Sequence, residues 1–588
     1  MHMLPVLGAL EEKRAGQPIA IIGVHSAKFD SEKDPAHVRA AVARYGIDHP
    51  VVVDADMAIW DRFGVQAWPT LVLIRPDGHI AGAIPGEVPL EVLDKAVGEI
   101  LDDARANGTL AKTQALPPRQ LQAQPGALAY PGKVIAAADG RLFVSDSRHH
   151  RVLELGHDGR ILETIGSGSQ GRASGTFDDA RLDDPQGLAF DRRANLLYVA
   201  DARGQTLWKA DLARREIVTI AGTGALGGAP FGRAQTASDA ELRTPWDLAL
   251  AGNLLYVAMA GSHQICVLDL TTGKIARFAG NGRETLADGP GPFASFAQPS
   301  GLALADGTLY VADSESSAIR AIDVASREVH TIVGTGLFDW GDRDGPLGPQ
   351  MLQHPLAVAW SKGGLYVADS YNGKIKRFDP GFTGLSTVLV EAEGLPLAGP
   401  AGLAIEADGS LVVADTDRSR LLRLSPGAGA ARSLPVRAAQ EVSVLGTAAS
   451  PTASPGVHPA KELPPRQLST GVDRIQLHLV APAGFTFSEA APWAVELSAD
   501  GGLRLHDSAA QGEASAGPRV TIPLGLSLEG PGTLRARVHA SVCDAVTHAA
   551  CYPVRESFAV ALSGGGAPSD SALDLPLSVP AGAATRAH

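Results

Sequence analysis

Residues 309–313 read Leu309-Tyr310-Val311-Ala312-Asp313, and closely similar strings recur along the middle of the chain. The other copies are Leu142-Phe143-Val144-Ser145-Asp146, Leu197-Tyr198-Val199-Ala200-Asp201, Leu255-Tyr256-Val257-Ala258-Met259, Leu365-Tyr366-Val367-Ala368-Asp369 and Leu411-Val412-Val413-Ala414-Asp415. A proline opens each copy, at Pro131, Pro185, Pro245, Pro299, Pro355 and Pro400. These six copies indicate a repeated supersecondary unit, which buries its two faces only by stacking on neighbouring copies.

Each copy supplies three or four strands. Fourth strands such as 217–220 and 329–332 are followed by Gly-Thr-Gly turns, where glycine adopts positive φ without strain. Six four-stranded units that close into a ring leave only short strand edges exposed. We therefore predict a six-bladed β-propeller over residues 126–440, and its repeats resemble those of NHL-repeat propellers.

The Asp that ends the second strand recurs in every copy except the third, where Met259 replaces it. A ring of carboxylates could bind metal around the central channel, or each carboxylate could cap a local turn by accepting backbone N–H bonds. We favour the cap, because Asp does this well at repeated structural positions. We predict no metal site and no cofactor, and we expect His25, His149, His150, His263 and His354 to be solvated or hydrogen-bonded.

Residues 1–106 alternate strand and helix patterns, which predicts a mainly parallel or mixed sheet with helices on its faces. One helix is marked by Asp34 as N-cap, Pro35 at its first position and Gly46 as its stop. The remaining elements are expected as strands over 19–24, 51–53, 70–74 and 79–84, a short helix over 57–63 and a last helix from Pro89 to Ala106.

This order resembles the thioredoxin fold, and Trp68-Pro69-Thr70 stands where that family has a cis-proline at the start of a strand. The resemblance implies a cis Trp68–Pro69 bond and places these three residues against the redox site. The alternative is an ordinary trans proline that opens a strand.

Thioredoxin-like enzymes carry Cys-x-x-Cys at the start of the first long helix, where the helix dipole lowers the thiol pKa. The first cysteine here is Cys266. In that family a proline follows the second cysteine by five positions, so Pro5 implies a cysteine immediately before Met1. The central strand that precedes the motif is also missing, which would leave a sheet edge unpaired. We expect Met1 to be an internal methionine, and no catalytic residue at this site within the chain.

Several longer strings are similar to thioredoxin-domain proteins that carry NHL repeats. They are Ile21 to Phe29, His49-Pro50-Val51-Val52, Trp68-Pro69-Thr70, Pro245-Trp246-Asp247 and Met259 to Gln264. The resemblance implies thiol–disulfide redox chemistry in the family, with the propeller surface as a platform for a protein partner. Because no other side chain replaces the thiolate in disulfide exchange, this chain is expected to be redox-inactive at its N-terminal site, and its status as an enzyme is open. The rival hypothesis is a non-catalytic interaction scaffold.

Residues 107–125 and 441–468 are Pro- and Ala-rich linkers, and both contain Leu-Pro-Pro-Arg-Gln-Leu, at 116–121 and 463–468. This string is either a shared docking segment or, as we favour, an extended polyproline-like run. Alternating segments over 469–565 predict a small antiparallel β-sandwich. The tail 566–588 is expected to be disordered. The whole chain is thus a multidomain, mainly β protein.

Two cysteines, Cys543 and Cys551, are close in sequence within the predicted sandwich. The Cys551-Tyr552-Pro553 string faintly resembles the immunoglobulin-like domain of the transmembrane thiol–disulfide interchange reductase. A redox pair, a static disulfide across a hairpin and two reduced thiols remain open. Cys266 alternates within an apolar strand and is expected to be a buried structural thiol.

The net charge of -13, without a long Lys or Arg run, argues against nucleic acid as a partner. No run of about 18 apolar residues is present, so no membrane partner is expected. Residues 1–10 lack the pattern of an export signal, which predicts a cytoplasmic protein, or an exported one if the true N-terminus lies upstream with a signal.

Overall fold

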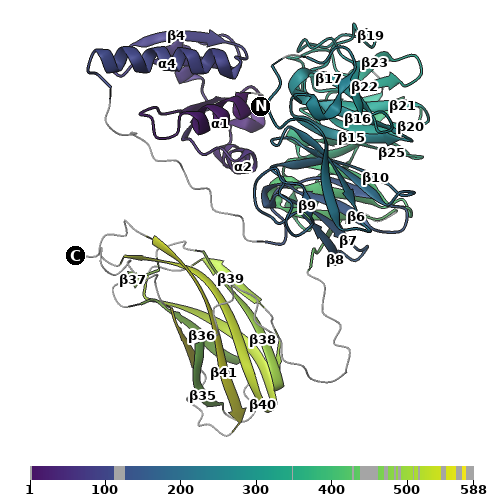
Figure 1. The fold of residues 1–588 in the computed structure, drawn as a ribbon. Helices are drawn as coiled ribbons and strands as arrows, with labels where there is room; N and C mark the ends of the chain where they lie inside the picture. Colours follow the sequence, from purple (N-terminus) through teal and green to yellow (C-terminus); the bar gives the residue numbers. More distant parts are fainter. Residues whose placement is uncertain are drawn as a thin grey trace. The chain divides into compact units, whose positions relative to one another are not determined.

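The computed structural model describes residues 3–577 except for 111–125, 229, 347, 427–429, 438–460, 469–473, 483–484, 488–491, 507–508, 514–516, 545–550 and 565–571 (Figure 1). The chain divides into two compact units, residues 1–442 and residues 443–588, the second of which we call the C-terminal unit. The first unit holds the N-terminal segment, residues 3–106, and the propeller. No helix of the described residues is long and apolar enough to cross a membrane.

The six predicted blades are confirmed, and each has four antiparallel strands in sequence order. The predicted second strands lie within β6, β11, β16, β21, β26 and β32. Blades 1 to 3 consist of β5 (Pro131–Ala136), β6 (Leu142–Asp146), β7 (Arg151–Leu155) and β8 (Ile161–Ile165); β10 (Pro185–Asp191), β11 (Leu196–Asp201), β12 (Thr206–Asp211) and β13 (Glu216–Ala221); and β15 (Pro245–Ala251), β16 (Leu254–Met259), β17 (Gln264–Asp269) and β18 (Lys274–Ala279).

Blades 4 to 6 follow the same order. They consist of β20 (Pro299–Ala305), β21 (Thr308–Asp313), β22 (Ala318–Asp323) and β23 (Glu328–Val333); β25 (Ala357–Ser361), β26 (Gly364–Asp369), β27 (Lys374–Phe378) and β28 (Gly384–Leu389); and β31 (Pro400–Ile405), β32 (Leu411–Asp415), β33 (Arg420–Leu424) and β34 (Arg432–Leu434). Alternating apolar side chains of adjacent blades form the core between them, and blade 6 packs on blade 1 in the same way.

Blades 2 to 5 carry a short fifth strand on the outer edge, which the repeat pattern did not predict. These two-residue strands are β9 (Gly175–Thr176), β14 (Gln235–Thr236), β19 (Gly289–Pro290) and β24 (Gly345–Pro346). In blades 4 and 5 an aspartate before the strand holds it, because Asp288 accepts the N–H of Thr331 at 3.0 Å and Asp344 accepts that of Thr387 at 2.7 Å. The added strands cover backbone edges that would otherwise be open to pairing.

The N-terminal segment has the expected helices and strands. They are α1 (Met3–Lys13), β1 (Gly23–Ser26), α2 (Pro35–Tyr45), β2 (Val51–Asp54), α3 (Ala58–Phe63), β3 (Thr70–Ile74), β4 (Ile80–Pro85) and α4 (Leu90–Ala106). Asp34 caps α2 by accepting the N–H of Ala36 at 2.8 Å, and Gly46 ends it with φ of 60°. The strand expected over 19–24 begins only at Gly23, because β1 has β2 as its single partner among the described residues.

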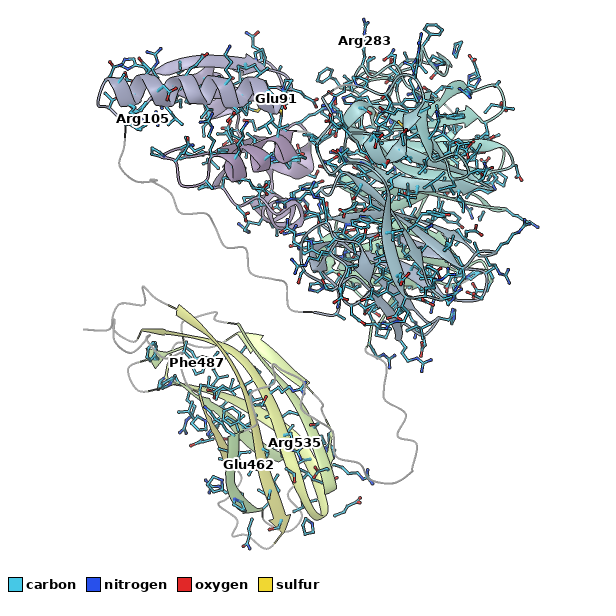
Figure 2. All side chains as sticks on the ribbon, viewed as in Figure 1. Glu91, Arg105, Arg283, Glu462, Phe487 and Arg535 are labelled. Atoms are coloured by element: carbon cyan, nitrogen blue, oxygen red, sulfur yellow. The ribbon has the colours of Figure 1, made fainter. Side chains whose placement is uncertain are left out.

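The C-terminal unit is an eight-stranded sheet with long, curved strands (Figure 1). Its buried side chains form one apolar core that includes Phe487, labelled in Figure 2, whereas Arg535 is exposed and pairs with Asp500 at 3.3 Å. The strands are β35 (Lys461–Leu468), β36 (Arg474–Val480), β37 (Phe485–Thr486), β38 (Pro492–Leu505), β39 (Ala509–Glu513), β40 (Arg519–Asp544), β41 (Cys551–Gly564) and β42 (Ala572–Pro576). The sandwich architecture itself stays a prediction.

Two boundaries predicted for this region are wrong. Strand β35 lies in the predicted linker 441–468 and pairs in parallel with β41, with a register shift between Leu463 and Arg466, where two prolines offer no N–H. Strand β42 lies in the predicted disordered tail 566–588 and pairs in parallel with β36, because Leu573 and Leu575 alternate into the core. The string at 116–121, residues 438–460 and residues 578–588 lie outside the described residues.

Candidate functional site

The loop at Pro69 is built on the carboxyl end of β2. Asp54 is buried there, and its carboxylate accepts the N–H groups of Ile59 and Trp60 at 2.9 Å each and the hydroxyl of Ser26 at 2.7 Å. Burial acts against the charge, but these three hydrogen bonds together lower the pKa of Asp54. The carboxylate therefore fixes the start of α3 and the end of β1 to one another.

The three residues predicted to face a redox site lie together on this frame. The Trp68–Pro69 peptide is cis, as the resemblance implied. The indole N–H of Trp68 donates to the carbonyl of Ser26 at 2.9 Å, and its ring lies 4.3 Å from that of Trp60 at an angle of 36°. The hydroxyl of Thr70 donates to the carbonyl of Ala67 at 2.7 Å. Sequence reasoning missed Ser26 and Trp60, although a tryptophan in a short helix just after a predicted strand was a visible signal.

Beside this loop the N-terminal segment leaves strand edges open. Among its described residues, β1 pairs only with β2 in parallel and β3 pairs only with β4 antiparallel, so the two pairs do not form one sheet. No cysteine precedes Cys266, which lies on β17 of blade 3. Burial raises the pKa of the Cys266 thiol far above its ordinary value. The site therefore has surfaces that can bind a polypeptide but no thiolate of its own.

The recurring aspartates of the blades are caps, as expected, and Asp201 caps its local turn by accepting the N–H of Gly204 at 3.1 Å, but their shared partner lies farther away. Each carboxylate accepts backbone N–H bonds from the loop that leads into the first strand of its own blade, 16 to 18 residues earlier. The pairs are Asp146 with Ala129, Asp201 with Asp183 and Asp184, Asp313 with Ala297, Asp369 with Gln353 and Asp415 with Ala398. In the described part of the chain no group of three or more His, Cys, Asp or Glu side chains could hold a metal ion.

Most of these buried carboxylates also face a donor on the third strand of the blade. Arg320 lies 3.1 Å from Asp313, and Lys376 lies 3.4 Å from Asp369. In blade 3 the acid and the base are both replaced, because Met259 stands in the place of the aspartate and Cys266 in the place of Arg320 and Lys376. The Met259 sulfur accepts the N–H of Arg243 at 3.3 Å. Cys266 is therefore a structural residue, as predicted from the sequence.

The axis of the propeller is closed where its innermost strands meet. Lys133 of β5 is buried, donates to the carbonyl of Ser300 at 2.7 Å and lies 3.5 Å from a carboxylate oxygen of Asp247 on β15. The backbones approach closely around this pair: a Cβ added to Gly187 would lie 2.4 Å from the Cα of Asp247. Burial lowers the pKa of Lys133 and raises that of Asp247. The strands are therefore tightly packed around this ion pair.

The N-terminal segment is anchored on the propeller through the residues that follow β1. Phe29 is 2% exposed, and its ring lies 4.8 Å from Trp340, 5.2 Å from Tyr371 and 5.7 Å from His354, all on loops and turns of the propeller. Beside it, Lys28 pairs with Glu315 at 2.8 Å. Burial acts against the Glu315 charge, but His354 and Lys28 hold the pKa of this carboxyl well below its usual range.

A second ion pair joins α2 to blade 6. Arg44 lies 2.8 Å from Asp417, and Tyr45 packs against a small cluster that contains Trp246 of blade 3. A pocket of about 80 Å³ next to Arg44 is well below the roughly 300 Å³ at which ligand pockets begin. None of these contacts could be found from the sequence, because their partners are hundreds of positions apart.

Four of the five histidines are hydrogen-bonded, as expected, and His25 is the exception. His149 bonds the carboxylate of Asp146 at 2.8 Å, and His354 bonds Glu315 at 3.1 Å. His150 contacts the carbonyl of Asp183. His263 accepts the N–H of Gln298 at 3.3 Å, whereas no hydrogen bond to the Nε2 atom of His25 is found among the described residues.

In the C-terminal unit, Cys543 on β40 is the register partner of Cys551 on β41. Residues directly opposite in antiparallel strands have Cα atoms about 4.5 to 5.5 Å apart, which lies within the range that a disulfide spans. The backbone therefore permits the bond, and the disulfide stays a prediction. The connection between the two strands, residues 545–550, lies outside the described residues.

Known proteins share the repeat and most of the chain. The sequence model of the NHL repeat matches residues 296–322, which cover β20, β21 and most of β22 in blade 4. NHL repeat-containing protein 2 of Bos taurus is 34% identical over 556 residues, which span 85% of this chain and 76% of the bovine protein. The chain belongs to the NHL repeat-containing protein 2 family.

Two further proteins are similar to parts of the chain. SUPPRESSOR OF QUENCHING 1, a chloroplastic protein of Arabidopsis thaliana, is 38% identical over 459 residues. This match spans 73% of the chain but only 43% of the Arabidopsis protein, so the chain covers less than half of that relative's length. Thiol-disulfide oxidoreductase YkuV of Bacillus subtilis is 24% identical over 98 residues, 17% of the chain and 66% of YkuV.

Proposed function

We propose that this member of the NHL repeat-containing protein 2 family serves thiol–disulfide exchange. In this proposal the N-terminal segment is thioredoxin-like and binds a disulfide-bearing polypeptide at Trp68-Pro69-Thr70. The propeller is a rigid platform for a protein partner, and residues 461–577 form a sandwich. The observation that carries the proposal is the loop itself, which has an exposed indole and a neighbouring strand edge in one place. The partial similarity to YkuV supports it.

The chain as printed should not catalyse this exchange at its N-terminal segment. A thiolate must attack the disulfide sulfur, and Cys266 is buried in blade 3 with its pKa raised by burial. The segment then contributes binding and orientation of the polypeptide, whereas the attacking thiol has to be supplied separately.

A gain-of-function experiment tests the proposal. A polypeptide extension that consists of a β-strand sequence followed by Cys-x-x-Cys is fused directly before Met1. The second cysteine then precedes Pro5 by five positions. We expect the extended chain to reduce insulin disulfides in the presence of dithiothreitol. We expect the chain without the extension to be no faster than dithiothreitol alone, because it has no exposed thiolate in the segment.

The matched control carries Ser-x-x-Ser in the same extension and should be inactive. If the Cys-x-x-Cys extension folds but stays inactive, the thiol–disulfide proposal is overturned. If the chain without the extension is active and loses this activity on Cys543→Ser, the redox chemistry belongs to the C-terminal unit.

The second candidate function is a non-catalytic interaction scaffold. It is favoured by the way Phe29, Lys28 and Arg44 hold the segment on the propeller, which would suit a purely structural role. Failure of the extended chain to reduce insulin would make this the better proposal.

A further inference from the structure

We infer that Trp60 and Trp68 form an aromatic platform that binds a bulky apolar side chain of an extended polypeptide. The inference deepens the proposed function, on which it rests for the statement that the polypeptide carries a disulfide. Binding to the platform itself requires no thiol. It therefore belongs to the chain as printed and can be measured there.

Trp68 is exposed and yet held in place. It is 41% exposed, although a tryptophan ring of this size gains much from burial. Its N–H is bonded to the carbonyl of Ser26, and one face of its ring is covered by Trp60. Only the remaining surface is open to a ligand. A fixed, half-exposed indole is typical of the aromatic anchors that dominate binding surfaces.

The Trp60 ring, which covers one face of Trp68, is held by a chain of hydrogen bonds. Trp60 lies in the first turn of α3, and the carboxylate of Asp54 accepts its backbone N–H. The same carboxylate accepts the hydroxyl of Ser26, whose carbonyl holds Trp68. Asp54 therefore positions both indoles at once. A surface that is already ordered loses little conformational freedom when a ligand binds, which favours affinity.

The surroundings of the platform suit an extended polypeptide. Strand β3 begins two residues after Trp68 and is paired only with β4 among the described residues. Strand β1, which ends at Ser26, is paired only with β2. An open strand edge offers backbone donors and acceptors to an added strand, and a pocket or ring beside it selects the side chain.

The elements that carry the platform also have exposed apolar side chains, beside the exposed charges of Asp61 and Arg62 in α3. Val24 of β1 and Val52 of β2 are register partners, and both are exposed. The occupant that matches an aromatic pair, apolar neighbours and open strand edges is an extended segment with an aromatic or large aliphatic side chain.

Fluorine NMR of the full chain labelled with fluorotryptophan tests this directly. The chain has seven tryptophans, and Trp60→Phe and Trp68→Phe assign the two signals of interest. The probe is a short capped peptide of glycine and serine with one central phenylalanine, and the matched peptide has glycine in its place. We expect the phenylalanine peptide to shift the signals of Trp60 and Trp68, but not that of Trp208, which is 1% exposed.

Variants give the size of the effect. Trp68→Ala should raise the Kd of the phenylalanine peptide by about fivefold or more, because a ring contact of this kind is lost. Trp68→Phe, which keeps a ring, should give an intermediate Kd and remains informative if Trp68→Ala does not fold. The matched control Trp360→Phe changes a tryptophan that stacks on Tyr310 within the propeller and should leave the Kd unchanged.

Equal shifts with both peptides, or an unchanged Kd in Trp68→Ala, would overturn the platform. Binding of the phenylalanine peptide by a chain whose Cys-x-x-Cys extension is inactive would leave the platform in place and overturn only the thiol–disulfide proposal. If the extended chain is active but does not bind the phenylalanine peptide selectively, the platform is overturned and the thiol–disulfide proposal stays in place.

Discussion

Lys133 and Asp247 form a buried ion pair at the axis of the propeller, contributed by the innermost strands of blades 1 and 3, with 3.5 Å between Nζ and Oδ2. The carboxylate also accepts the N–H groups of Leu248 and Leu302 at 2.9 Å each. Blades that are distant in sequence are thus joined at the centre of the ring.

Removal of one partner should be costly. Asp247→Ala leaves the Lys133 ammonium buried without its carboxylate, which typically lowers the free energy of unfolding by about 3 to 5 kcal/mol. The double variant Lys133→Met, Asp247→Leu should recover most of this loss, because no charge is then buried. Urea unfolding followed by circular dichroism measures both. An Asp247→Ala chain as stable as the parent would contradict a structural role for the pair.

In blade 3 both the acid and the base are replaced, by Met259 and Cys266, and this replacement gives a second prediction. Asp313→Ala removes the buried carboxylate that faces Arg320 and accepts the N–H of Ala297, and Arg320 then keeps only the half-exposed Asp288 as an acidic partner among the described residues. We expect a loss of about 3 kcal/mol in the free energy of unfolding. The matched change Met259→Asp should also destabilise, although it restores the residue found in the other blades, because Cys266 offers no cation. Met259→Asp combined with Cys266→Arg should be less destabilised than Met259→Asp alone. If Met259→Asp and its combination with Cys266→Arg are equally stable, the two replacements in blade 3 do not depend on each other.

The local parts of the fold could be predicted, whereas its long-range contacts could not. The six prolines and second strands carry the blade pattern in sequence, and Asp34 and Gly46 mark the ends of α2 by local signals. By contrast, Phe29 meets Trp340 and Tyr371 only because the chain folds back over hundreds of residues. At the candidate site, Trp68, Pro69 and Thr70 followed from a motif, but the role of Asp54 depended on the geometry of the start of α3.

The first and last strands of the C-terminal unit, β35 and β42, were not predicted from the sequence for a different reason. Pro464 and Pro465 favoured a linker, although β35 accommodates them with a shift in register. In and just after β42 the alternation of Leu573, Leu575 and Leu577 was a strand signal, but it is short and lies in a tail rich in Ala, Pro and Ser. Its place beside β36 is fixed by burial of these leucines in a core built from distant strands.

Burial of Asp201 predicts a dependence of stability on pH. Desolvation in blade 2 raises the pKa of Asp201 to about 6, above its value in an unfolded chain. Between about pH 4 and pH 6 the folded chain therefore binds more protons than the unfolded one, and the free energy of unfolding falls as pH rises through this window. Asp201→Asn should remove this part of the slope, at most about 1.4 kcal/mol per pH unit. Urea unfolding at a series of pH values measures it, and an unchanged slope would contradict the assignment.

The register of β40 and β41 leads to a prediction on thiols. If Cys543 and Cys551 are joined after oxidation in air, the denatured but unreduced chain should react with a thiol reagent at Cys266 alone. Reduction before denaturation should expose all three cysteines of the chain. The Cys543→Ser variant is the control, because it leaves Cys551 without a partner. Three reactive thiols in the oxidised chain would show that the disulfide does not form.

The last prediction concerns the anchor of the N-terminal segment. Phe29→Ala removes a ring that is 2% exposed and packed among Trp340, His354 and Tyr371, so the contact should weaken by about 3 to 5 kcal/mol. Phe29 and the ion pair between Arg44 and Asp417 both hold the segment to the propeller. When the Phe29 ring is removed, we expect the segment to loosen while the blades stay folded. Hydrogen exchange followed by mass spectrometry should then show faster exchange in α2 and at Tyr371, but unchanged exchange in β11 and β12. Phe293→Ala is the matched control, since that ring is 76% exposed and should alter neither region. Unchanged protection of α2 in Phe29→Ala would mean that the ion pairs of Lys28 and Arg44 hold the segment without the ring.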